Sequence, residues 1–173
     1  MKVEGSYKLP VARAQLWELM IDPAVLARCV PGCESLTATD EGAYKLTLKT
    51  GVGSIKGLFT GAIRLADMRA PEHYRMIVDG KGAPGFLKGD GALELVEQGE
   101  ETVINFTGDV NVGGTLASVG QRMIHSTAKL MAGQFFAALA AEAKARAEAA
   151  ASGQPFAPPK QGFVRNAIRQ IKN

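Results

Sequence analysis

Two cysteines on either side of a short turn are the first candidate for chemistry in this sequence. Cys29 and Cys33 flank Val-Pro-Gly, a spacing that could hold a metal ion or support thiol chemistry. A zinc site takes four ligands, however, and the two histidines, His73 and His125, lie far away along the chain. A catalytic cysteine also needs a base close to it, and none is local. The pattern favours two small apolar residues packed around a turn, so we expect no catalytic residue and no bound metal.

The acidic residues and the second histidine offer little catalytic chemistry. The aspartates of the central region fall at the ends or on the polar sides of expected strands, with no pair on one known face for general acid–base catalysis. They are Asp67, Asp79, Asp90 and Asp109. His125 lies beside the apolar stripe of an expected long helix. It could donate a hydrogen bond to a ligand inside a cavity, or it could bond to backbone or water at the edge of the core.

A glycine-rich stretch, residues 80–91, resembles a phosphate-binding loop only superficially. It lacks the Walker pattern and does not lead from a strand into a helix. We expect a flexible hairpin with two apolar residues, Phe86 and Leu87, at its tip. An exposed apolar tip could gate a cavity or touch a partner protein, whereas a phenylalanine folded back on the core would do neither.

The composition predicts one soluble domain with a basic tail. The 173 residues are 46% hydrophobic and 21% charged, which suffices for one core of ordinary size. No apolar run approaches the length of a membrane span, and the N-terminus lacks the apolar segment of a signal peptide, so we expect a cytoplasmic protein. The net charge is +3, but residues 152–173 carry four basic residues and no acid. The nearly neutral body argues against nucleic-acid binding, and the tail points to an acidic surface on a membrane or a protein.

Alternation of apolar and polar residues predicts seven strands. Residues 2–9 form the first strand, and residues 34–113 contain six more, joined by short turns that are typical of antiparallel neighbours. Glycines inside these strands indicate bends or close backbone approach. We therefore expect a strongly curved sheet with something lying in its concave side.

Helical periodicity appears in two places. Two short helical segments lie between residues 16 and 29, and a long amphipathic helix is expected between residues 116 and 151. Met123 and Leu130 widen the apolar stripe of the long helix, which should face the sheet. The stripe itself consists of Ile124, Ala128, Met131, Phe135 and Leu139. Together these elements predict an α+β domain over residues 1–149.

The inner side of the sheet and the helix stripe are expected to enclose a cavity. Glycines inside the strands remove side-chain volume there, which leaves room for a ligand among large apolar residues. The expected lining consists of Phe59, Met76, Phe106, Met123, Met131 and Phe135. The alternative is that these side chains simply fill the core. Phe86, Leu87 and His125 complete the set of candidate ligand-binding residues.

The end of the chain has a different character. Residues 150–162 form a proline-rich linker, and residues 163–173 form a basic amphipathic tail. The expected membrane-binding residues are Phe163, Val164, Arg165, Ile168, Arg169, Ile171 and Lys172. A helix this short is marginal by itself, so we expect weak, reversible, salt-sensitive binding to an anionic membrane. The rival interpretation is that the same apolar stripe docks in a groove on a protein partner.

Several sequence blocks resemble the CoxG family of carbon monoxide dehydrogenase proteins, within the START-like helix-grip superfamily. The resemblance covers about residues 1–145, and its Cys-Val-Pro-Gly-Cys and Gly-Val-Gly-x-x-Lys-Gly blocks are fairly specific. The matching stretches are Met1-Lys-Val-Glu-Gly-Ser, Leu16-Trp-Glu-Leu-Met, Asp22-Pro, Leu26-Ala-Arg-Cys-Val-Pro-Gly-Cys-Glu, Gly51-Val-Gly-Ser-Ile-Lys-Gly, Gly80-Lys-Gly, Gly85-Phe-Leu-Lys-Gly, Val112-Gly-Gly and Leu116-Ala.

The resemblance implies a fold and a function. The fold would be a curved seven-stranded antiparallel sheet around a long C-terminal helix and an apolar cavity, with no catalytic residues. The function would be that of an accessory protein of a molybdenum hydroxylase of the carbon monoxide dehydrogenase type. It would bring the enzyme or its electrons to the inner face of the cytoplasmic membrane, with no covalent cofactor but with a lipophilic ligand such as a respiratory quinone. The alternatives are a small-molecule enzyme of the same superfamily, such as a cyclase or hydratase, and a pure scaffold.

Overall fold

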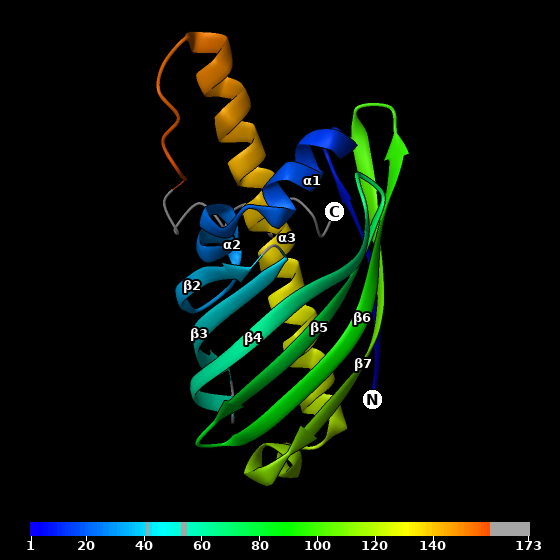
Figure 1. Cartoon of the computed structure of the whole chain (residues 1–173), viewed down its shortest axis with the longest axis vertical. Coiled ribbons are helices and arrows are strands. Elements are labelled where there is room, and N and C mark those ends of the chain that lie inside the picture. The colour runs from blue at the N-terminus through cyan, green and yellow to red at the C-terminus, as the bar shows by residue number, and fades with distance from the viewer. Residues whose placement is uncertain (41, 53–54, 160–173) are drawn as a thin grey trace.

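Seven antiparallel strands form one curved sheet, and a long helix lies in its concave side (Figure 1). The structure is a computed structural model that describes residues 1–40, 42–52 and 55–159. The strands are β1 (Lys2–Leu9), β2 (Cys33–Asp40), β3 (Ala43–Val52), β4 (Ile55–Arg69), β5 (His73–Gly82), β6 (Gly85–Gln98) and β7 (Glu101–Gly113). The helices are α1 (Arg13–Ile21), α2 (Pro23–Cys29), a 3₁₀ helix (Gly114–Val119) and α3 (Gln121–Ser152). The predicted α+β class and its seven antiparallel strands are confirmed.

The strand order follows from the short connections. Strands β2 to β7 form a meander, and β1 returns to the edge beside β7, which gives the order β1-β7-β6-β5-β4-β3-β2. Every residue of β1 has a partner on β7, from Lys2 opposite Asp109 to Leu9 opposite Thr102. The first and last strands in the chain are therefore neighbours, and α1 and α2 are held above the sheet between β1 and β2 (Figure 1).

One pair of glycines shows how closely the backbone of the curved sheet approaches itself. Gly91 of β6 lies opposite Gly108 of β7. A Cβ atom added at Gly91 would lie 2.8 Å from the carbonyl oxygen of Thr107, and one added at Gly108 would lie 3.0 Å from that of Asp90. Only glycine fits without a shift of the backbone, so the sequence-based expectation of close approach is confirmed here.

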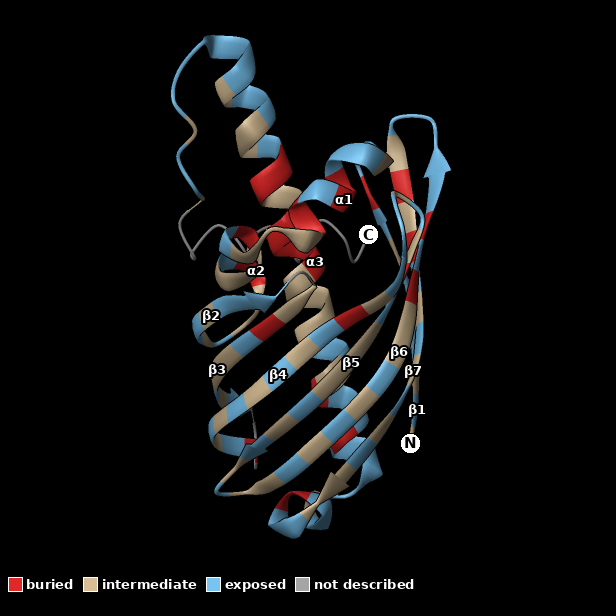
Figure 2. Cartoon of the chain, in the orientation of Figure 1, coloured by how far each residue is buried: buried red, intermediate tan, exposed pale blue. Residues whose placement is uncertain are grey.

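The tightly packed core lies where α1 and α2 meet α3 and one end of the sheet. Leu16 and Met20 of α1, Ile104 of β7 and Leu139 of α3 are each at most 1% exposed. Figure 2 shows the buried residues gathered at this end, whereas the lower part of the sheet alternates between intermediate and exposed positions. The ring of Trp17 packs edge-on against Tyr74, with 5.6 Å between the ring centroids. The two small helices therefore close one end of the space between sheet and helix.

Helix α3 differs from its prediction at its beginning and on one side. It begins at Gln121 because the preceding residues form the 3₁₀ helix, and it ends at Ser152 before Gly153 in the left-handed region. Met123 and Leu130, expected to widen the apolar stripe, are 37% and 44% exposed. The stripe is narrower than predicted because the sheet covers only one side of the helix.

Candidate functional site

An apolar cavity of about 360 Å³ lies between the sheet and α3. The inner faces of β3 to β7 supply most of its wall, and one stripe of α3 supplies the other side. Residues of the wall include Tyr44, Ile63, Met76, Leu93, Phe106 and Phe135. The volume lies in the range of known small-molecule pockets, so there is room for a ligand of modest size.

The cavity has a closed end and an open end. Around Met20, Tyr44 and Tyr74 the lining side chains are at most 5% exposed, because α1 covers them. Toward the β5–β6 hairpin the lining includes Leu87 and Val110, which are only half-buried. An apolar molecule would therefore enter from the hairpin end and reach inward toward α1.

Five of the nine candidate ligand-binding residues line this cavity. Met76, Leu87, Phe106, Met131 and Phe135 contribute to its wall. They come from β5, β6, β7 and α3, and alternation along the strands turns the first three toward α3. The helical spacing of the last two places them on one stripe of α3.

The other four candidates lie outside the cavity, and the expectation that they line it is wrong. Phe59 is on the inner side of β4 but stands opposite Gly82, near the end of the strand and past the cavity. Phe86 is 44% exposed and packs its ring against Gly113. Met123 and His125 are exposed in the first turns of α3.

The hairpin residues Phe86 and Leu87 are neighbours in β6 and therefore point to opposite sides of the sheet. Only Leu87 reaches the cavity. The turn itself is formed by Ala83 and Pro84, with β5 extending as far as Gly82. A gate made of both apolar side chains at one tip does not match this geometry.

Two tyrosines that are not among the sequence-based candidates, Tyr44 and Tyr74, lie at the closed end of the cavity. Both occupy inward positions of their strands, so the signal was present in the alternation pattern. Burial raises the pKa of each hydroxyl, which keeps both groups neutral at physiological pH. They are the polar groups of an otherwise apolar wall at this end.

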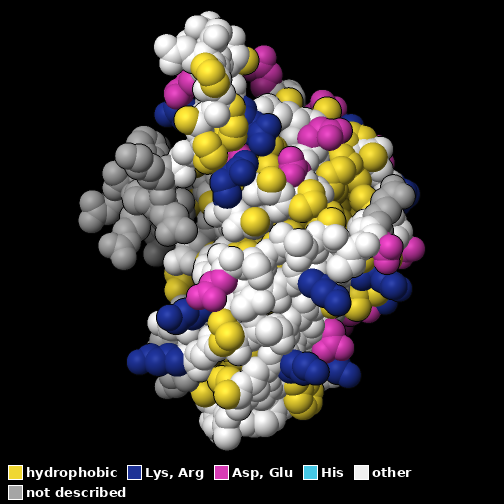
Figure 3. Space-filling view, turned by 60° about the vertical axis from the view of Figure 1, so that its left-hand side comes forward, with side chains coloured by type: hydrophobic (Ala, Val, Ile, Leu, Met, Phe, Trp, Pro, Cys, Tyr) yellow, Lys and Arg dark blue, Asp and Glu magenta, His cyan; other side chains and the backbone are white. Residues whose placement is uncertain are grey.

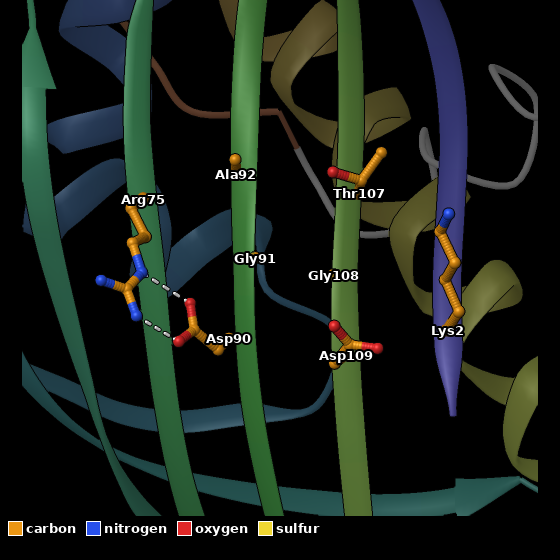
Figure 4. Close-up of a pocket in the computed structure, with 8 residues that line it drawn as sticks. All are labelled: Lys2, Arg75, Asp90, Gly91, Ala92, Thr107, Gly108 and Asp109. Atoms are coloured by element: carbon orange, nitrogen blue, oxygen red, sulfur yellow. Dashed lines mark hydrogen bonds and ion pairs between the residues drawn. The ribbon is translucent and has the colours of Figure 1, made fainter.

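A second, shallow pocket lies on the outer side of the same strands (Figure 4). Arg75 donates hydrogen bonds from Nε and Nη2 to the carboxylate of Asp90, and the Nε bond is 2.8 Å long. These bonds hold the pKa of Asp90 below its ordinary value. Lys2 and Asp109 line the pocket beside them, and all four side chains are exposed. Exposed ion pairs of this kind contribute little to stability.

A buried carboxylate joins α2 to α3. Glu142 is 2% exposed and accepts hydrogen bonds from Nε and Nη2 of Arg28, the former at 3.3 Å, and one from Nη2 of Arg146 at 3.5 Å. The ring of Phe156 lies over the Arg146 guanidinium, 4.5 Å from carbon to ring centroid, and 5.8 Å from that of Arg28. The segment after α3 is thus anchored beside α2.

Replacing Arg28 with alanine should destabilise the protein because Glu142 would lose its two-pronged partner. We expect a loss of about 1–2 kcal/mol, less than for a fully buried pair because both arginines are partly exposed and Arg146 remains. Urea unfolding measures the change. The double variant Arg28→Ala, Glu142→Gln removes the unpaired charge and should regain part of the loss. A double variant less stable than the single one would contradict this account.

The two cysteines are free thiols, and their environment suits packing. Cys29 is buried, and desolvation, with a smaller contribution from Glu142, raises the pKa of its thiol to about 12. Cys33 is half-buried, and its thiol faces the carbonyl oxygen of Ser35 at 3.5 Å. Both thiols stay protonated at neutral pH, so neither is an activated nucleophile. Within the described ranges, no group of three or more His, Cys, Asp or Glu side chains is placed to hold a metal ion.

Comparison with known proteins decides the family. The model of the CoxG family, which is named for a component of carbon monoxide dehydrogenase, matches residues 5–144. The chain belongs to the CoxG family. Membership ties the chain to carbon monoxide dehydrogenase and confirms the resemblance seen in its sequence blocks. No curated protein matches the chain.

Solved structures support the CoxG assignment and the fold. A conserved protein from Geobacillus kaustophilus is 33% identical, with a TM-score of 0.81 over 86% of this chain and 97% of that one. The ZhuI aromatase/cyclase from Streptomyces sp. R1128 is 16% identical, with a TM-score of 0.66 over 87% and 97%. A START superfamily protein from Mycobacterium smegmatis is 12% identical, with a TM-score of 0.58 over 78% and 94%. The last two show the fold alone, and the predicted START-like helix-grip fold is confirmed.

The candidate membrane-binding residues, from Phe163 to Lys172, lie outside the described residues. The described part of the linker, residues 154–159, runs back alongside α3 (Figure 1). Within the described ranges, no helix combines the length and the apolar character needed to cross a bilayer.

Proposed function

We propose that this CoxG-family chain is a non-enzymatic accessory protein that carries a lipophilic molecule, such as a respiratory quinone, in its cavity. Its client would be a molybdenum hydroxylase of the carbon monoxide dehydrogenase type, which it would recruit, or whose electrons it would pass, to the cytoplasmic membrane. The observation that carries the proposal is the apolar cavity of about 360 Å³ between the sheet and α3. Such a wall favours binding by burial of apolar surface.

The alternative, a cyclase or hydratase acting in the same cavity, has less support. Acid–base catalysis needs groups that exchange protons near neutral pH. The closed end of the cavity offers two tyrosine hydroxyls whose pKa values are raised by burial. The aromatase/cyclase among the structural neighbours shares the fold at 16% identity, which says nothing of its chemistry in this chain.

Filling the cavity tests the proposal directly. Ala132 of α3 lines the wall and is half-buried, so the variant Ala132→Phe would place a ring where a ligand would lie. We expect its affinity for 2-methylnaphthalene, measured by equilibrium dialysis, to fall at least about tenfold relative to the unchanged chain. Thermal unfolding should remain cooperative, because the ring occupies existing space.

A matched control uses the same substitution on the same helix. Ala147 is exposed near the end of α3, so Ala147→Phe should leave the affinity for 2-methylnaphthalene unchanged. Equal binding by the Ala132→Phe variant and the unchanged chain would contradict a ligand in this cavity. Failure of the unchanged chain to bind would leave the scaffold as the better description.

The membrane part of the proposal depends on the basic tail. Figure 3 shows basic and acidic side chains interspersed on the face that carries α2 and β2, so this face offers no uniform positive surface to an anionic membrane. Residues 160–173 contain four basic residues and no acid. Because Phe156 anchors the preceding segment beside α2, the tail starts from a fixed place on the molecule. We propose that it binds the inner face of the membrane reversibly.

A further inference from the structure

The polar groups at the closed end of the cavity differ in one respect. The hydroxyl of Tyr44 donates a hydrogen bond to the carbonyl oxygen of Ile21, at 2.8 Å. The hydroxyl of Tyr74 makes no hydrogen bond with any residue that the structure describes, although the side chain is only 3% exposed. An unpaired hydroxyl in so buried a position is unusual and calls for a partner.

The hydroxyl of Tyr74 faces the cavity. Alternation along β5 turns Tyr74 inward together with Met76 and Val78, and all three line the cavity. Among the described residues, the side-chain polar atoms with neither a partner nor accessible surface belong to His73, Thr127 and Arg146. The oxygen of Tyr74 is not one of these, so it keeps some accessible surface. Because the side chain is almost fully buried in the cavity wall, that surface opens into the cavity.

The chemistry of this hydroxyl selects a class of partner. Burial, with a smaller contribution from Tyr44, raises the pKa of Tyr74, so the group is neutral and available as a donor. Its surroundings are apolar, with Met20 and Leu65 also in the wall of the closed end. A hydrogen bond in such a site discriminates strongly between molecules that have an acceptor and those that lack one.

We propose that Tyr74 is the donor that holds an oxygen of the ligand at the closed end of the cavity. The ligand class is an apolar molecule with a carbonyl-type acceptor at one end, bound with that end innermost and its apolar remainder directed toward Leu87 and the hairpin. This inference rests on the proposed carrier function, since it needs a ligand in the cavity. It goes beyond that function in assigning the orientation of the ligand and the residue that selects its polar group.

Two probes that differ by their carbonyl oxygens test the proposal. Menadione is 2-methylnaphthalene with two ring carbonyl groups, so a comparison of the two isolates the acceptor. In Tyr74→Phe, equilibrium dialysis should show affinity for menadione falling about five- to tenfold, while affinity for 2-methylnaphthalene changes less than about twofold. Tyr7→Phe is the matched control, because Tyr7 lies outside the cavity wall and its hydroxyl reaches the carbonyl of Lys129.

The outcomes separate this inference from the carrier function. If the unchanged chain binds both probes and Tyr74→Phe binds menadione as tightly as before, the role of Tyr74 is overturned and the carrier function stands. If Tyr74→Phe loses both probes equally, the tyrosine acts as part of the wall and the donor role is overturned. If the unchanged chain binds neither probe, both proposals fail. Thermal unfolding of Tyr74→Phe should match the unchanged chain, because the removed hydroxyl has no protein partner.

Discussion

Replacing Leu139 with alanine should lower the free energy of unfolding by about 3–4 kcal/mol, the usual cost of a large void in a close-packed core. Leu139 is fully buried on α3, in the part of the core where Leu16 and Met20 of α1 pack. For a chain of this size the loss corresponds to a fall in Tm of roughly 10 °C. Urea unfolding followed by circular dichroism measures the free energy, and a thermal scan measures Tm.

Leu130→Ala is the matched control for this experiment. Leu130 lies on the same helix but is 44% exposed, so its truncation should change stability by less than about 0.5 kcal/mol. Nearly equal losses at the two positions would mean that α3 does not pack on the sheet as described. The pair thus tests the packing of the helix without any assumption about ligands.

Removing the tail should abolish binding to anionic vesicles. The four basic residues beyond Pro159 could contribute about 1 kcal/mol each, or about 4 kcal/mol before the cost of ordering, which is close to a thousandfold in affinity. In vesicle flotation the full chain should rise with anionic liposomes at low salt and remain at the bottom with neutral ones. A variant that ends at Pro159 should remain at the bottom in both cases, and it keeps the contact of Phe156 with Arg146.

Two further observations decide between membrane and protein as the partner of the tail. High salt should release the full chain from the vesicles, because the attraction is largely electrostatic. The double variant Ile168→Ser, Ile171→Ser should bind more weakly at low salt, because it loses apolar burial while keeping every charge. If the full chain stays at the bottom of the gradient at low salt, the membrane role is wrong and a protein partner becomes the better interpretation.

The strands and their inward faces were predictable from the sequence because alternation is a local property of extended backbone. Tyr74, Met76 and Val78 alternate with Arg75 and Ile77, and this pattern alone assigns the first three to one face. The stripe of α3 followed from helical spacing for the same reason. The glycine pair of β6 and β7 was recognisable because glycine inside a strand pattern marks close approach. Family membership was visible in sequence blocks around the Cys-Val-Pro-Gly-Cys turn.

Which inward residues border empty space was decided only by the tertiary structure. Alternation tells which face a side chain occupies but not how far along the strand the helix lies above it. Phe59 and Tyr74 both face inward, yet the first lies beyond the cavity and the second lies at its closed end, because α1 covers that end alone. The contact of Arg28 with Glu142 joins residues 114 positions apart and holds α2 on α3. Long-range packing of this kind sets the distance between helix and sheet, and local periodicity carries no information about it.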